Sequence, residues 1–87
     1  MTRAIYTITH DARGYLVVFE DRPYGPYAEL LDAFKTAAHS AFDAAKQNAD
    51  GAEVFVQEDG GRRTIWASEV DSYPMDFRAR LGLPPLF

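Results

Sequence analysis

The segment that decides the fold is residues 27–49, YAELLDAFKTAAHSAFDAAKQNA. Its apolar residues recur at spacings of three and four, the period of a helix that packs one face against a core. Charged side chains run down the opposite side, and Gly51 follows as a left-handed helix stop. The many alanines let this helix lie close to a sheet. Its apolar face comprises Tyr27, Leu30, Leu31, Phe34, Ala38, Ala41, Phe42, Ala45 and Ala49.

Before the helix, residues 3–10 and 15–20 have the pattern of a β-hairpin. Residues 11–14 (Asp-Ala-Arg-Gly) form its turn, because Asp accepts local hydrogen bonds and Gly supplies a positive φ. We expect His10 to pair with Tyr15, which fixes which side chains share a face. The predicted core face holds Tyr6, Ile8, Val17 and Phe19, and the other face holds Ile5, Thr7, Thr9, Leu16 and Val18.

Residues 21–26 (Asp-Arg-Pro-Tyr-Gly-Pro) lie between this hairpin and the helix. Proline has no N–H to donate to a strand ladder, so we expect the second strand to end by Asp21. Pro26 suits the first turn of a helix, where its missing N–H would have had no partner. The segment is therefore predicted to be a connector.

After the helix, residues 53–58 and 63–68 form a second hairpin around the tight-turn sequence Asp59-Gly60-Gly61. Simple alternation of faces along both strands divides their side chains into two groups. The small and branched group is predicted to face the helix: Val54, Val56, Ile65 and Ala67. The group predicted to face away is Phe55, Gln57, Thr64 and Trp66.

These elements predict an α+β fold: a four-stranded, mainly antiparallel sheet in the order ββαββ, with one long helix on one face. The expected strand order is 2-1-3-4, with the third strand parallel to the second through a right-handed crossover. Residues 1–68 form the single domain, and residues 69–87 form an apolar C-terminal extension that packs on the domain or on a partner.

The composition of the chain excludes several classes of function. The 87 residues include no cysteine, which excludes disulfides and thiolate chemistry. The net charge of −4 argues against a protein whose main task is binding nucleic acid. The N-terminal residues lack a signal-peptide pattern and no apolar run reaches membrane-spanning length, so we expect a cytoplasmic protein that does not enter a membrane.

Candidate catalytic groups do not converge. His39 and Asp43 lie one helical turn apart, but Ser40 projects away from His39 around the helix and cannot serve as its nucleophile. His10 and Asp11 are two ligands without a third, which does not make a metal site. We therefore expect no catalytic residue, metal or cofactor, and no enzymatic activity.

The sheet face away from the helix gives the leading hypothesis. An apolar patch on an antiparallel sheet normally marks an interface. Three things could cover this face: the chain's own tail, a second copy in a homodimer, or another partner or ligand. The hypothesis is a non-enzymatic protein-interaction module that self-associates through this face. The candidate contact residues are Leu16, Val18, Phe55 and Trp66, with Ile5 beside them.

The alternative hypothesis is a nucleic-acid-associated or antitoxin-like regulator. Arginines lie in the second hairpin and the tail, and a local basic patch is possible on an acidic protein. Such a protein would bind nucleic acid with a steep dependence on salt. The candidate basic patch is Arg62, Arg63, Arg78 and Arg80.

Short motifs around the helix carry two resemblances. In order, they are Tyr6-Thr7-Ile8, Gly14-Tyr15-Leu16-Val17, Val54-Phe55-Val56, Asp59-Gly60-Gly61-Arg62 and Asp71-Ser72-Tyr73-Pro74. This series resembles a family of small uncharacterised bacterial proteins with a ββαββ plan, a Gly-Trp start to the second strand and an Asp-Gly turn. The resemblance covers about residues 4–74 and implies a fold without an activity.

The first half of the chain also looks like the HicB-type antitoxins. Those proteins have a strand, a Gly-Tyr pair that opens the next strand, here Gly14-Tyr15, and then an alanine-rich helix. The resemblance implies binding to a small toxin protein and, through a separate segment, to DNA. Their plan includes a third strand before the helix, where residues 23–26 predict a connector in this chain.

Overall fold

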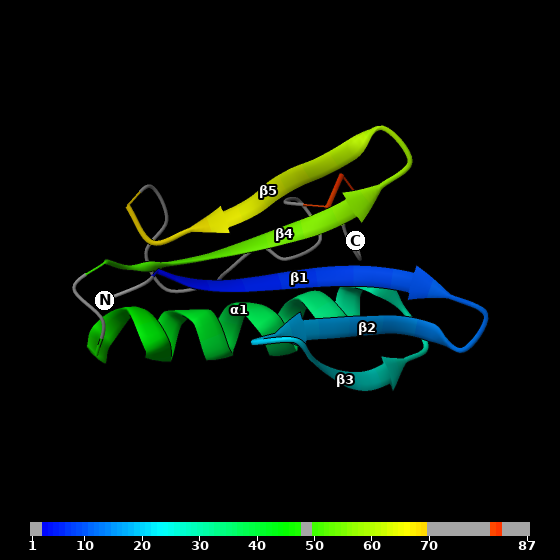
Figure 1. Cartoon of the computed structure of the whole chain (residues 1–87), viewed down its shortest axis with the longest axis horizontal. Helices are drawn as coiled ribbons and strands as arrows, with labels where there is room; N and C mark the ends of the chain where they lie inside the picture. The colour runs from blue at the N-terminus through cyan, green and yellow to red at the C-terminus, as the bar shows by residue number, and fades with distance from the viewer. Residues whose placement is uncertain (1–2, 48–49, 70–80, 83–87) are drawn as a thin grey trace, which may run out of the picture.

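One helix packed on one face of a five-stranded mixed sheet makes up the part of the chain that the computed structural model describes, residues 3–47, 50–69 and 81–82 (Figure 1). The strand order across the sheet is β3-β2-β1-β4-β5. This confirms the α+β class and the single long helix. The elements are β1 (Ala4–Asp11), β2 (Gly14–Phe19), β3 (Arg22–Tyr27), α1 (Leu30–Gln47), β4 (Ala52–Glu58) and β5 (Gly61–Ala67).

The predicted connector is wrong, because residues 22–27 form the strand β3. Glu20 and Asp21 both have positive φ, 52° and 65°, and make the two-residue turn that returns the chain along β2. Residues other than glycine are uncommon with positive φ, so the residues of this turn do not predict a hairpin. β3 is an edge strand, and an edge is where proline is tolerated. Pro23 lies opposite Val18 there.

The additional strand also changes the direction of the sheet. We expected β4 to run antiparallel to β1, but the two are parallel neighbours, with Tyr6 opposite Val54 and Ile8 opposite Val56. β3 reverses the chain once more before the helix, so the crossover through α1 starts from the other end of the sheet. The predicted neighbours β2-β1-β4-β5 are confirmed, and the sheet is mixed rather than mainly antiparallel.

The helix α1 begins at Leu30 rather than at residue 27, because Pro26 and Tyr27 belong to β3. Its buried side chains are mostly alanines, which bring its axis close to the sheet. The core lies between this face of α1 and the central strands. The fully shielded members, each 0% exposed, are Ala33, Ala37, Ala38, Ala41, Ala52 and Val54.

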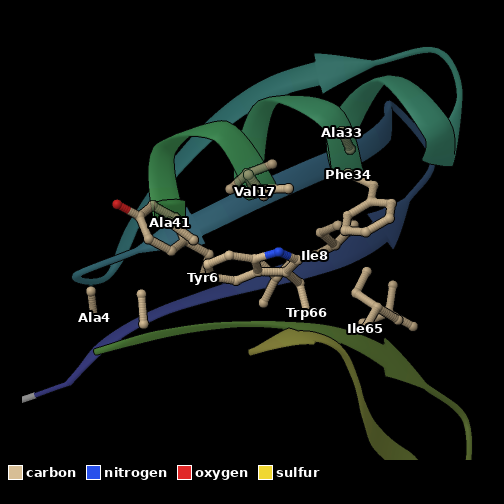
Figure 2. Packing of buried hydrophobic residues seen from close by; sticks show 14 residues of the cluster. Ala4, Tyr6, Ile8, Val17, Ala33, Phe34, Ala41, Ile65 and Trp66 are labelled. Carbon is tan, nitrogen blue, oxygen red and sulfur yellow. The ribbon is translucent and has the colours of Figure 1, made fainter. Parts of the chain in front are cut away.

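A β-bulge in β5 moves Trp66 to the opposite face from the one predicted. Val54 lies opposite Trp66 and Phe55 lies opposite Thr64, so Ile65 is an extra residue without a partner on β4. A bulge of this kind turns both of its residues toward the same face. Trp66 and Ile65 are accordingly 2% and 4% exposed in the core cluster, and the indole lies near the middle of that cluster in Figure 2.

Little of the C-terminal extension falls within the described residues. Leu81 packs against the core cluster. The rest of the predicted extension, residues 70–80 and 83–87, lies outside the described part of the chain. Within the described residues, α1 is not long and apolar enough to cross a membrane.

Truncation of Trp66 should destabilise the domain rather than detach a partner. Trp66→Ala is expected to lower the free energy of unfolding by about 3–5 kcal/mol, because a large buried ring leaves a cavity. Urea denaturation followed by circular dichroism measures this loss. Thr64→Ala, at an exposed position on the same strand, is the control and should change stability by less than about 0.5 kcal/mol. A Trp66→Ala variant as stable as the control would contradict the core position of the ring.

Tyr6 should make the fold sensitive to alkali. Its ring stacks on Phe19, with centroids 4.4 Å apart, and its hydroxyl donates to the Ser40 carbonyl at 3.4 Å. Burial, followed by the nearby carboxylates of Glu20 and Asp43, raises the pKa of the Tyr6 phenol. The neutral Tyr6 phenol therefore contributes its full stabilisation of the fold below about pH 10, the value at which the phenol ionises in the unfolded chain. This contribution is lost as pH rises above that value.

The matched pair Tyr6→Phe and Tyr24→Phe tests this expectation. Tyr24 is 47% exposed, so its replacement serves as the control. The free energy of unfolding of Tyr6→Phe should fall less steeply above about pH 10 than that of the wild type. Equal slopes for both variants would show that Tyr6 ionisation does not contribute.

Candidate functional site

The sheet face opposite α1, here called the far face, carries a row of side chains that crosses the central strands. Thr7 on β1 lies opposite Val18 on β2 and Phe55 on β4, and Phe55 lies opposite Thr64 on β5. Val18, Thr7 and Phe55 are half-buried, and Thr64 is exposed. Apolar and hydroxyl side chains therefore alternate along the row.

Two further apolar residues lie on the far face and differ in exposure. Ile5 is 40% exposed, whereas Leu16, opposite Thr9, is only 7% exposed although it is not part of the core cluster beneath α1. With Trp66 on the other side of the sheet, the far face is less apolar than the sequence predicted. Three of the four predicted contact residues, Leu16, Val18 and Phe55, share this face.

Arg62 covers the Phe55 ring. The two residues are diagonal neighbours on the far face, because Gln57 lies opposite Arg62 and Phe55 is two residues along β4. The guanidinium carbon lies 4.5 Å from the ring centroid, a cation–π contact. The hairpin register alone could have identified this pair, since the turn at Asp59-Gly60 fixes it.

The two described members of the predicted basic patch, Arg62 and Arg63, lie on opposite faces of the sheet. Arg63 lies opposite Val56, whose side chain is in the core, so it shares the face that α1 covers while Arg62 is on the far face. Its Nε donates to Glu58 Oε1 at 2.6 Å. An ion pair this exposed contributes little to stability but neutralises the charge of Arg63 locally. Arg78 and Arg80 lie outside the described residues.

A cavity of about 230 Å³ opens beside the amino end of α1. His10 stacks on Tyr15 at its wall with centroids 4.2 Å apart, which confirms the predicted contact between these residues. The cavity is smaller than most ligand sites, and its charged groups, Glu58 and Arg63, pair with each other. Its lining is Ile8, Thr9, His10, Tyr15, Leu30, Val56, Gln57, Glu58 and Arg63.

An ion-pair cluster at the other end of the sheet was missed by sequence reasoning. Arg3 Nε donates to Glu53 Oε1 at 2.6 Å, its Nη1 donates to the Asp50 carbonyl at 2.9 Å, and its Nη2 donates to Glu69. The hydrogen bond to Glu69 raises the pKa of Arg3 and lowers the pKa of Glu69. These contacts fasten β1 to the start of β4 and the end of β5. Partners separated by 50 and 66 positions give no local sequence signal.

The remaining polar candidates serve turns and surfaces. In the first hairpin, Arg13 donates a backbone N–H to Asp11 Oδ1 at 2.8 Å and pairs with it through its guanidinium, which lowers the pKa of Asp11. His39, Ser40 and Asp43 are all exposed on α1. Among the described residues, no three His, Asp or Glu side chains are grouped so that they could hold a metal ion.

The far face with its Arg62–Phe55 pair is therefore the candidate site, and the chemistry that it offers is apolar contact, hydroxyl hydrogen bonding and one stacked cation. Comparison with known proteins adds no assignment: no family model matches the chain, and neither a curated protein nor a solved structure is significantly similar to it.

Proposed function

We propose that the protein is a non-catalytic protein-interaction module that self-associates through the far face. The observation that carries the proposal is the combination of Ile5, 40% exposed, with half-buried Val18 and Phe55 on a face that α1 does not cover. An exposed large apolar side chain beside others of the same kind favours association.

A second copy suits this face because a two-fold contact needs only one self-complementary surface. The row runs from Val18 through Thr7 and Phe55 to Thr64. It places apolar side chains beside two threonines, and threonine hydroxyls can hydrogen-bond to one another across a dimer axis. Phe55 lies on β4, next to the central strand β1, and aromatic side chains of this kind are frequent anchors of interfaces. Its flanking Arg62 is a residue type enriched at interfaces.

Light scattering across a concentration series tests self-association. The wild type should approach a mass near twice 9.8 kDa, and Phe55→Glu should remain monomeric because it places a charge in the middle of the contact. The matched control is Thr36→Glu, which adds the same charge at an exposed position on α1. A monomeric wild type at every concentration, or an unchanged mass for Phe55→Glu, would refute the proposal.

A regulator of the antitoxin type is the second candidate. The strand β3 supports it, because a third strand before the helix belongs to the plan of the HicB-type antitoxins that the first half resembles. The Arg62 guanidinium over the Phe55 ring offers a cationic group on which unpaired bases can stack.

Fluorescence anisotropy with a labelled single-stranded oligonucleotide tests this second candidate. If the protein contacts three phosphates, an increase in salt from about 50 mM to about 200 mM should weaken binding about twentyfold. Arg62→Gln should reduce the affinity, whereas Arg13→Gln in the other hairpin turn should not. The lack of any binding at low salt would end the nucleic-acid reading.

A further inference from the structure

The two edges of the sheet differ in their capacity to accept another strand. β3 carries Pro23 and Pro26, neither of which has an N–H, and its register with β2 is irregular between Tyr15 and Val17. β5 has no proline, and among the described residues it pairs with β4 along one side and with no strand along the other. Alternate N–H and C=O groups of β5 therefore point outward, as they do on any edge strand.

The bulge limits the usable length of this edge. The ladder between β4 and β5 is regular from Gly61 to Thr64 and shifts register at Ile65. All four residues of the regular stretch are exposed. A strand that adds to β5 would thus gain its main-chain hydrogen bonds along residues 61–64.

The positive charge on this stretch favours an added strand that carries acidic side chains. β5 contains Arg62 and Arg63 and no acidic residue. Arg63 pairs with Glu58 on the neighbouring strand, but among the described residues no carboxylate pairs with Arg62, whose guanidinium lies over the Phe55 ring. A guanidinium that lies over an aromatic ring still has N–H donors at its edge, and a carboxylate can accept two of them.

We propose that the β5 edge binds an extended acidic segment of another protein by strand addition, with a carboxylate of that segment on Arg62. A second copy of the chain is a poorer occupant of this edge, because its β5 offers the same two arginines and no acid. The proposal does not rest on self-association, which uses the far face.

A labelled heptapeptide in which Glu alternates with Thr tests the proposal by fluorescence anisotropy. Alternation places every carboxylate on one side of the added strand, so a register shift of two residues still leaves a carboxylate beside Arg62. Two further versions of the peptide carry N-methyl groups on one or the other alternate set of backbone nitrogens. A fourth version replaces each Glu by Lys.

Strand addition predicts that the acidic peptide binds, that one of the two N-methylated versions loses binding, and that the Lys version does not bind. Arg62→Gln should weaken the acidic peptide about tenfold, a typical loss for a charge-assisted pair. Arg13→Gln is the matched control, because Arg13 also lies in an exposed hairpin and its loss should leave the affinity unchanged.

Three results would overturn the proposal: no binding of the acidic peptide at about 1 mM, equal binding of both N-methylated versions, or equal affinities of Arg62→Gln and the wild type. Binding of an oligonucleotide through Arg62 without binding of the acidic peptide would assign this edge to nucleic acid instead. Light scattering on the same samples reports self-association separately, so failure of one proposal is distinguishable from failure of the other.

Discussion

The close approach of an alanine-lined helix to the central parallel strands is the constraint on which the rest of the structure depends. Ala33, Ala37, Ala38 and Ala41 are fully buried against β1 and β4. Alanine keeps the helix near the sheet but fills little volume, so the large side chains of the core must come from elsewhere. Phe34 supplies one ring from the helix, and Tyr6 and Trp66 supply the others from the sheet.

This demand for volume accounts for the bulge in β5. Regular alternation would place only one of Ile65 and Trp66 toward the helix, whereas the bulge turns both of them inward. The indole gains burial at the cost of its Nε1–H, which has no hydrogen-bond partner among the described residues. The same displacement removes the largest apolar group from the far face and leaves Thr64 and Arg62 beside Phe55.

The parts of the structure that sequence reasoning predicted correctly are those set by local pattern. The helix, both tight-turn hairpins and the pairing of His10 with Tyr15 follow from periodicity and turn residues within a few positions of one another. Trp66 was predicted on the wrong face because of the one-residue bulge, which has no sequence signature here. Every side chain of β5 after the bulge points to the face opposite to the one that simple alternation predicts. β3 was missed because its two prolines argue against a strand anywhere except at the edge of a sheet. Whether a segment lies at an edge depends on how the whole sheet is arranged, which local sequence does not show.

The inequality of the two edges bears on the size of any complex. A sheet with two open edges can add strands from both sides, and its assemblies have no natural end. Here prolines interrupt one edge, and the other is regular over only four residues before the bulge. Within the described residues, regular pairing is therefore open to a further strand only along residues 61–64 of β5, and this difference between the edges works against strand addition from both sides and against growth into fibres.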